Sequence, residues 1–101
     1  MSQARVEQGR NGRLEIHGDL NSASVARLWR EASAWLPARE QLEVDLSHVA
    51  RSDSAGLALL VECLRRARQT GATIRFFNIP AQMLAIARVS ALDEVLPLER
   101  D

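Results

Sequence analysis

The sequence has no lysine, a single cysteine, no excess of charge of either sign and no long apolar run. Without lysine, Schiff-base chemistry is excluded. One cysteine, Cys63, cannot form an internal disulfide, which fits a reducing compartment. Thirteen basic residues balance thirteen acidic ones, so the chain lacks the electrostatic footprint of a protein that binds nucleic acid or an anionic bilayer. No stretch approaches the roughly 20 apolar residues of a membrane-spanning helix, and the N-terminus lacks the apolar core of a signal peptide. We therefore expect a cytoplasmic protein with no direct membrane insertion.

The sequence does contain enough apolar residues for one core. Of its 101 residues, 47% are hydrophobic and 26% are charged, and a chain of this size buries roughly two-thirds of its unfolded surface. Glycine and proline occur singly between periodic segments, as turn residues do. We expect a single domain over residues 1–101.

The first half of the chain predicts a hairpin followed by a helix. Asn11–Gly12 is a strong signal for a type I′ turn, and alternating apolar and polar residues follow it from Leu14 onward. Asn21–Leu36 carries apolar side chains on one stripe at helical spacing, and Pro37 is predicted to stop the helix.

The second half predicts two strand–helix units and a short ending. Gln41–Leu46 alternates as a strand does, and a polar loop leads from it into a helix over Ser54–Thr70. Thr73–Phe77 is β-branched and aromatic, and a shorter helix follows over about Ala81–Val89. From Leu92 onward we expect a last turn and a short edge strand. The pattern predicts an α/β fold with a mixed sheet of four or five strands and helices packed mainly on one face.

Residues able to carry catalysis or bind a metal do not gather in the sequence. The two histidines, His17 and His48, fall on different predicted elements, and no metal-ligand, nucleophile or dinucleotide-binding motif occurs. We interpret both histidines as solvated or locally hydrogen-bonded, Cys63 as a packed thiol, and Trp29 and Trp35 as core residues. We expect no enzyme activity, no cofactor and no metal.

The most informative stretch runs from Asp45 to Leu57, where a strand ends and a helix begins. Ser52 or Asp53 can cap that helix by accepting hydrogen bonds from its free backbone N–H groups. Ser54 then lies in the first turn, where those N–H groups and the helix dipole would stabilise a phosphate. Ordinary capping and a phosphorylation switch at Ser54 both fit this pattern.

A helical-wheel projection separates a buried side of that helix from an exposed side. The residues predicted to face the core are Leu57, Leu60, Leu64 and Ala67. The residues predicted to face outward are Ser54, Ala55, Ala58, Leu59, Glu62, Arg65, Arg66 and Gln69. Small residues beside Ser54 would let another protein approach the backbone closely, and the charged residues would form a polar rim. The exposed side is a candidate docking surface, although a lone exposed leucine is also normal.

The sequence resembles the STAS domains, the family of anti-anti-sigma factors and of the cytoplasmic ends of some anion transporters. The resemblance spans nearly the whole chain and rests on Leu14–Leu20, on Val44–Leu46 followed by Asp53–Leu57, and on the strand after Gly71. In anti-anti-sigma factors the serine that follows the loop aspartate is phosphorylated by an anti-sigma kinase. That position corresponds to Ser54.

Within the family, the chain is more similar to the MlaB-type STAS subunits of the Mla phospholipid ABC transporters of Gram-negative bacteria. Ala55–Val61, the Leu28–Trp29 pair and the ending Asp93–Pro97 carry this similarity. It implies a non-catalytic subunit that binds the transporter's cytoplasmic ATPase, in a complex with permease and lipid-binding subunits. Such a complex moves phospholipid between the inner and outer membranes and maintains lipid asymmetry. The hydroxyl residue at the position of Ser54 lies at the ATPase contact in those subunits. Together, the loop motif, the helical wheel and this resemblance give the candidate partner-binding or regulatory residues Asp53, Ser54, Ala55, Gly56, Ala58, Leu59, Glu62, Arg65 and Arg66.

Two departures from the family patterns bear on the choice between these roles. Phosphorylated anti-anti-sigma factors usually carry a hydrophobic residue before the loop aspartate and Ser or Thr two places after it, whereas this chain has Ser52 and Ala55. The MlaB-type subunits more often have Thr and Gly where Ser54 and Ala55 stand, and these changes keep the hydroxyl group and the small size. An ATPase-binding accessory subunit is the leading hypothesis. The alternatives are an anti-anti-sigma factor regulated by phosphorylation of Ser54, and a minimal enzyme or small-ligand binder that uses Asp53 and His48.

Overall fold

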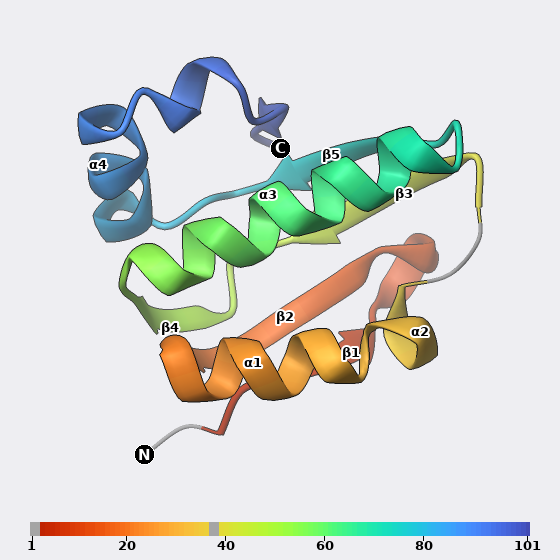
Figure 1. Ribbon diagram of the computed structural model, residues 1–101, viewed down its shortest axis with the longest axis horizontal. Helices are drawn as coiled ribbons and strands as arrows, with labels where there is room; N and C mark the ends of the chain where they lie inside the picture. Colours follow the sequence, from red (N-terminus) through yellow and green to blue (C-terminus); the bar gives the residue numbers. More distant parts are fainter. Residues whose placement is uncertain (1–2, 37–38) are drawn as a thin grey trace.

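A mixed β-sheet forms the framework of the protein. The computed structural model describes residues 3–36 and 39–101, apart from the side chains of residues 33 and 34 (Figure 1). Within this part the strands follow the order β1-β2-β3-β5-β6, and β4 also pairs with β2. The strands are β1 (Arg5–Gln8), β2 (Leu14–Leu20), β3 (Gln41–Asp45), β4 (Val49–Ser52), β5 (Thr73–Phe77) and β6 (Leu98–Glu99). β1 runs antiparallel to β2, and the other pairs are parallel. The predicted mixed α/β sheet is confirmed. In the described residues it has six strands where four or five were expected, because the sequence pattern did not reveal β4.

Two helices cover one face of this sheet. The helices are α1 (Ser22–Arg30), the one-turn α2 (Ala32–Trp35), α3 (Ser54–Gln69) and α4 (Ala81–Val89), with 3-10 turns at Arg10–Gly12 and Leu92–Glu94. α1 and α3 lie next to each other in front of the sheet, and α4 lies beyond the start of α3 (Figure 1). The predicted arrangement of helices on one face is therefore confirmed.

The predicted hairpin is formed by β1 and β2. Asn11 and Gly12 both have positive φ angles, 63° and 76°, as a type I′ turn requires. The turn sets a register in which Val6 lies opposite Ile16. β2 then alternates buried and half-buried residues, so one of its faces is turned to the core and the other to solvent.

The single helix predicted over Asn21–Leu36 is interrupted at Glu31, which has φ −94° and ψ 5°. The indole Nε1 of Trp35 donates to the carbonyl of Leu28 over 2.8 Å. In a continuous helix, that carbonyl would accept from the N–H four residues later. The indole therefore takes the place of one helical hydrogen bond at the break. Pro37, which was predicted to stop the helix, lies outside the described residues.

β4 occupies the segment that was predicted to be a loop before α3. The pairing of β3 with β2 ends at Asp45, and the next residue, Leu46, donates its backbone N–H to the carbonyl of Phe77 on β5 (2.8 Å). The chain then rejoins β2 further along, with Val49 opposite Gly18. β4 is short, and its buried residues do not alternate with exposed ones. A period-two pattern was therefore absent from the sequence.

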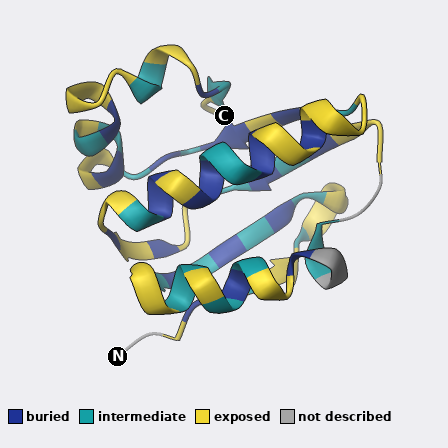
Figure 2. Cartoon of the chain, in the orientation of Figure 1, coloured by how far each residue is buried: buried dark blue, intermediate teal, exposed yellow. Residues whose placement is uncertain are grey.

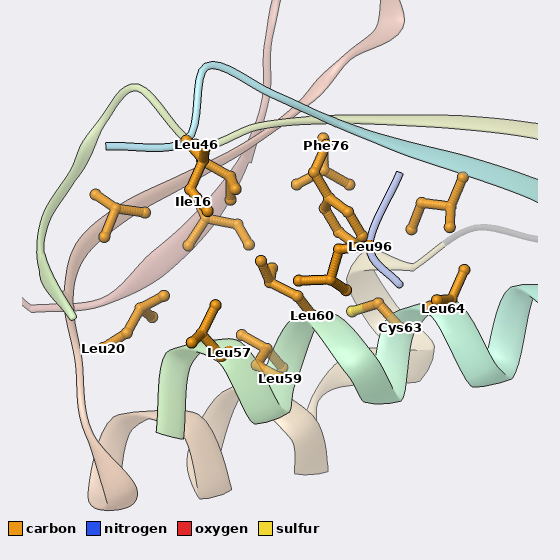
Figure 3. Packing of buried hydrophobic residues seen from close by; sticks show 14 of the residues in the cluster. Ile16, Leu20, Leu46, Leu57, Leu59, Leu60, Cys63, Leu64, Phe76 and Leu96 are labelled. Atoms are coloured by element: carbon orange, nitrogen blue, oxygen red, sulfur yellow. The ribbon is translucent and has the colours of Figure 1, made fainter. Parts of the chain in front are cut away.

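One hydrophobic core lies between the sheet and the helices (Figure 2). Leu60 and Leu64 on α3 are buried, as the helical wheel predicts. Leu59 is only 1% exposed, and its predicted place on the outer side is wrong. α3 packs against α1 as well as against the sheet, and Figure 3 shows Leu59 on the side of α3 that is turned toward α1.

Candidate protein-docking site

The start of α3 is fixed by Asp53 and by a side chain from α4. Asp53 Oδ1 accepts from the backbone N–H of Ala55 (2.8 Å), so Asp53 is the capping residue. Ser52 instead uses its hydroxyl to donate to the carbonyl of Asp53 (2.9 Å). The side-chain amide of Gln82 accepts from the Ser52 N–H (3.2 Å) and donates to the Ser52 carbonyl (2.6 Å). These bonds hold the end of β4 and thereby set the direction in which α3 leaves the sheet.

Gly56 lets the first turn of α3 approach β2 closely. A Cβ atom at this position would lie 2.0 Å from Ser52 Oγ and 3.1 Å from the Cβ of Leu20. Both distances are below ordinary van der Waals contact, and Gly56 is buried. Gly56 was included among the partner-binding residues, but the structure places it inside the protein. It serves the site by positioning α3.

An apolar groove of about 260 Å³ separates α1 from α3. Its lining residues are Ser22, Val25, Ala26 and Trp29 on α1, and Ala55, Ala58, Leu59 and Glu62 on α3. Ala58 is exposed, Ala55 is half-exposed and Leu59 is buried, so Leu59 contributes to the bottom of the groove. Ser54 is exposed on the first turn of α3, directly before the small residues of the groove.

A polar depression of about 370 Å³ continues along the same two helices. Its lining residues are Trp29, Arg30, Glu62, Arg65, Arg66 and Gln69. Arg65 donates to Glu62 over 2.9 Å, and the guanidinium of Arg66 lies 5.5 Å from the centroid of the Trp29 ring. The face formed by α1 and α3 therefore changes from apolar near Ser54 to arginine-rich at its other end. We call the two depressions together the α1–α3 face.

Most of the predicted partner-binding residues lie on or beside this face. Those with accessible surface are Asp53, Ser54, Ala55, Ala58, Glu62, Arg65 and Arg66. The opposite wall of the groove includes Val25, Ala26 and Trp29, which were not predicted as partner-binding residues. The apolar stripe of α1 gave a signal for Val25 and Trp29, but this signal was interpreted as core. Both are only partly buried, because the stripe is divided between the core and the groove.

The positions of Cys63 and of the Asp53–His48 pair bear on two further predictions. Cys63 is 1% exposed, and its burial raises the pKa of the thiol to about 12, which fits the predicted packing role. β4 lies between His48 and Asp53, so the two residues are five positions apart, or about 16 Å of extended chain at roughly 3.3 Å per residue. The ring of His48 stacks on that of His17. The structure does not bring Asp53 and His48 into one site.

Among the described residues, α3 is the longest helix, and neither it nor the others combine the length and apolar character needed to cross a bilayer.

Comparison with known proteins identifies relatives of two kinds. The MlaB protein of Haemophilus influenzae, named as the intermembrane phospholipid transport system binding protein, is 28% identical over 85 residues, which are 80% of this chain and 81% of that protein. The anti-sigma factor antagonist SpoIIAA in its unphosphorylated form superimposes with a TM-score of 0.73 at 15% identity, over 97% of this chain and 87% of that chain. An anti-sigma factor antagonist from Mycobacterium paratuberculosis gives a TM-score of 0.74 at 18% identity, over 97% and 85% of the two chains. At these identities the two structures show a shared fold.

The family match says more about this chain than the similarity of fold does. The sequence profile described as "Mlab, STAS domain" matches residues 4–98, a range that includes both walls of the α1–α3 face. The chain therefore belongs to the MlaB family of STAS domains.

Proposed function

We propose that the protein is a non-catalytic accessory subunit of a phospholipid-transporting ABC complex, and that it binds the ATPase subunit of that complex through the α1–α3 face. The family match and the name of the Haemophilus relative support the role in phospholipid transport. The observation that carries the docking surface is the apolar groove beside the exposed Ser54. In this account the protein lies on the cytoplasmic side of the inner membrane and is held there by the other subunits.

The composition of the face suits a protein partner. Ala55 and Ala58 have small side chains, so a partner can approach the α3 backbone closely. Trp29 offers a partly buried aromatic surface on the opposite wall, and tryptophan is enriched among the residues that contribute most to binding energy. The arginines form a polar rim around this centre, as interfaces commonly have.

The charges of the face indicate the chemistry of the partner. The polar depression is lined by Arg30, Arg65 and Arg66, with Glu62 as its acidic residue. Arg65 is paired with Glu62, which leaves two arginines whose charge a partner can complement. We therefore expect the partner segment to place an apolar side chain in the groove and acidic side chains against this end of the face.

The test is capture of the co-expressed ATPase subunit by the tagged protein. Ala58→Arg places a long charged side chain in the groove and is expected to abolish capture. Ser54→Thr keeps the hydroxyl group and is expected to retain it. Ala85→Arg is a matched control, because Ala85 is an exposed alanine on α4. Capture by Ala58→Arg at the level of Ala85→Arg, with both variants folded by their melting curves, would exclude the α1–α3 face from the interface.

A second candidate function is that of an anti-anti-sigma factor whose partner choice depends on phosphorylation of Ser54. It is supported by the fold shared with anti-sigma factor antagonists and by the exposure of Ser54 at the start of α3. Ser54→Glu separates the two functions. In the docking account, the docked ATPase desolvates a carboxylate beside the groove without giving it a partner, which is costly, so capture of the ATPase is lost. In the switch account, the carboxylate imitates the phosphorylated state and changes sigma-dependent transcription.

A further inference from the structure

Three side chains of the types that ligate metal ions meet on the face of the sheet that is turned away from α1 and α3. Glu15, His17 and His48 each offer one ligand atom, and these atoms all lie within 4.8 Å of one another. Nε2 of His17 is 3.0 Å from Oε1 of Glu15, and the centroids of the two imidazole rings are 4.4 Å apart. We propose that this cluster binds a divalent transition-metal ion such as Zn²⁺ through two imidazoles and one carboxylate.

The backbone places the three ligands before any metal arrives. Glu15 and His17 are two residues apart on β2, so their side chains point to the same face of the sheet, and Ile16 between them is buried in the core. His48 lies where the chain returns to β2, and its carbonyl accepts from the backbone N–H of Gly18 (3.2 Å). Ligands held by strands and backbone hydrogen bonds lose little freedom on binding. This cluster could not be predicted from the sequence, because its two histidines come from different elements.

The ligand atoms lie near enough to one another for side-chain rotation to bring them around one Zn²⁺. Zinc binds imidazole nitrogen and carboxylate oxygen at about 2.0–2.2 Å, so the ligand atoms of a tetrahedral site are about 3.3 Å apart. The separations in the cluster can reach this value by side-chain rotation, because His48 is exposed and Glu15 is half-exposed. Nδ1 of His48 lies 3.3 Å from the hydroxyl oxygen of Ser47. A partner of this kind orients a ligating histidine from the outer shell.

A fourth ligand is available on β1. Oε2 of Glu7 lies 3.7 Å from Nε2 of His17, and Glu7 stands opposite Glu15 in the antiparallel register. Glu7 or a water molecule can therefore complete a four-coordinate site. Two histidines with one or two carboxylates form a donor set that suits zinc and related transition metals.

The charges around the cluster favour a cation. Glu15 has Glu7 opposite it on β1 and Asp45 opposite it on β3, and like charges directly opposite each other in a sheet repel. Arg5 faces the same group: its Nε donates to Glu7 (2.5 Å), and its Nη2 lies 3.4 Å from Nδ1 of His17. The side chain of Arg5 is 56% exposed and can turn away when a metal binds. A bound divalent cation would offset the repulsion among the three carboxylates.

The test is titration of the full-length, tag-free protein with ZnCl₂, followed by calorimetry and by thermal melting. The wild-type protein should bind one Zn²⁺ and melt at a higher temperature with it. His48→Ala and Glu15→Gln each remove one ligand. Loss of an outer-shell group already lowers metal affinity by about 10- to 100-fold, so each variant should bind Zn²⁺ at least about tenfold more weakly than the wild type. Glu43→Gln is the matched control, because Glu43 lies on β3 and is paired with Arg13 and Arg75, outside the cluster. It should bind Zn²⁺ as the wild type does.

Arg5→Gln should change the affinity for Zn²⁺ in the opposite direction. Loss of the positive charge beside His17 should strengthen Zn²⁺ binding, whereas damage to the fold would weaken it. No heat and no shift in melting temperature for the wild type would overturn the proposal. Equal Zn²⁺ affinities for the wild type and His48→Ala would also overturn it. The cluster and the α1–α3 face lie on opposite sides of the sheet, so neither result bears on the proposed docking function.

Discussion

The close approach of α3 to β2 at Gly56 can be tested by adding a single methyl group. In Gly56→Ala, the new Cβ would meet Ser52 Oγ at 2.0 Å and Leu20 Cβ at 3.1 Å. Adding a methyl group to a packed interior costs about 1–3 kcal/mol. Displacement of the Ser52 hydroxyl also forfeits its hydrogen bond to the Asp53 carbonyl, at about 1 kcal/mol. Alanine regains about 1 kcal/mol over glycine through helix propensity. The expected net loss is about 2 kcal/mol.

Urea denaturation measures this loss, with the slope of the transition as a check that both proteins unfold in the same way. In thermal melting, a loss of this size lowers the midpoint by about 8 °C for a domain of this length. Gly9→Ala is the control, because its Cβ would meet the end of the flexible Glu15 side chain and should change stability little. Ser52→Ala removes the clashing oxygen and should restore part of the stability lost in Gly56→Ala. Wild-type stability for Gly56→Ala would refute the account of how α3 is positioned.

Three further predictions concern the core and the charged C-terminus. Leu59→Ala should cost about 2–5 kcal/mol in urea denaturation, as Leu60→Ala should; a loss below about 1 kcal/mol would mean that Leu59 does not pack between α3 and α1. The thiol of Cys63, with its pKa raised to about 12 by burial, should not react with iodoacetamide at pH 8 until the protein unfolds, and rapid labelling of the folded protein would contradict this burial. The hydrogen bond from Arg13 lowers the pKa of the Asp101 carboxyl to about 2, so the ion pair stabilises the fold above the ordinary pKa of about 3.9 and is lost as the pH falls through about 2. An NMR titration should show this low pKa in the wild type and a higher pKa in Arg13→Gln, where the hydrogen bond from Asn78 still lowers it; equal values in the two proteins would exclude the pair.

The elements that the sequence predicted are those set by local chemistry. The hairpin follows from the positive φ angles that Asn11–Gly12 adopts. The bounds of α3 and α4 follow from apolar spacing within each segment. The break in α1 could not be predicted in this way, because it accompanies a hydrogen bond between the indole of Trp35 and the carbonyl of Leu28. β4 was missed because its residues do not alternate between buried and exposed positions. It is a strand because it pairs with β2.

The candidate site was partly predictable for the same reason. Asp53 and Ser54 could be placed at the start of α3 from residue type and position. The helical-wheel projection allowed for one packing surface on α3, so it assigned Leu59 to the exposed side. In the structure, α1 covers that position. The stacking of His17 on His48 depends on where the chain rejoins β2. Such contacts between distant elements leave no spacing pattern in a single sequence.

The most direct test of the docking account is the dissociation constant of the purified protein with the ATPase subunit, measured by calorimetry for the wild type, Ala58→Arg and Ala85→Arg. The few residues that dominate an interface each cost about 2 kcal/mol or more when they are truncated, and each 1.4 kcal/mol is tenfold in affinity. A charged side chain that fills the groove is expected to cost at least as much. We therefore expect Ala58→Arg to bind at least about 30-fold more weakly than the wild type, with an unchanged melting temperature. Ala85→Arg should bind as the wild type does. Equal affinities for all three proteins would contradict the docking of the ATPase on the α1–α3 face.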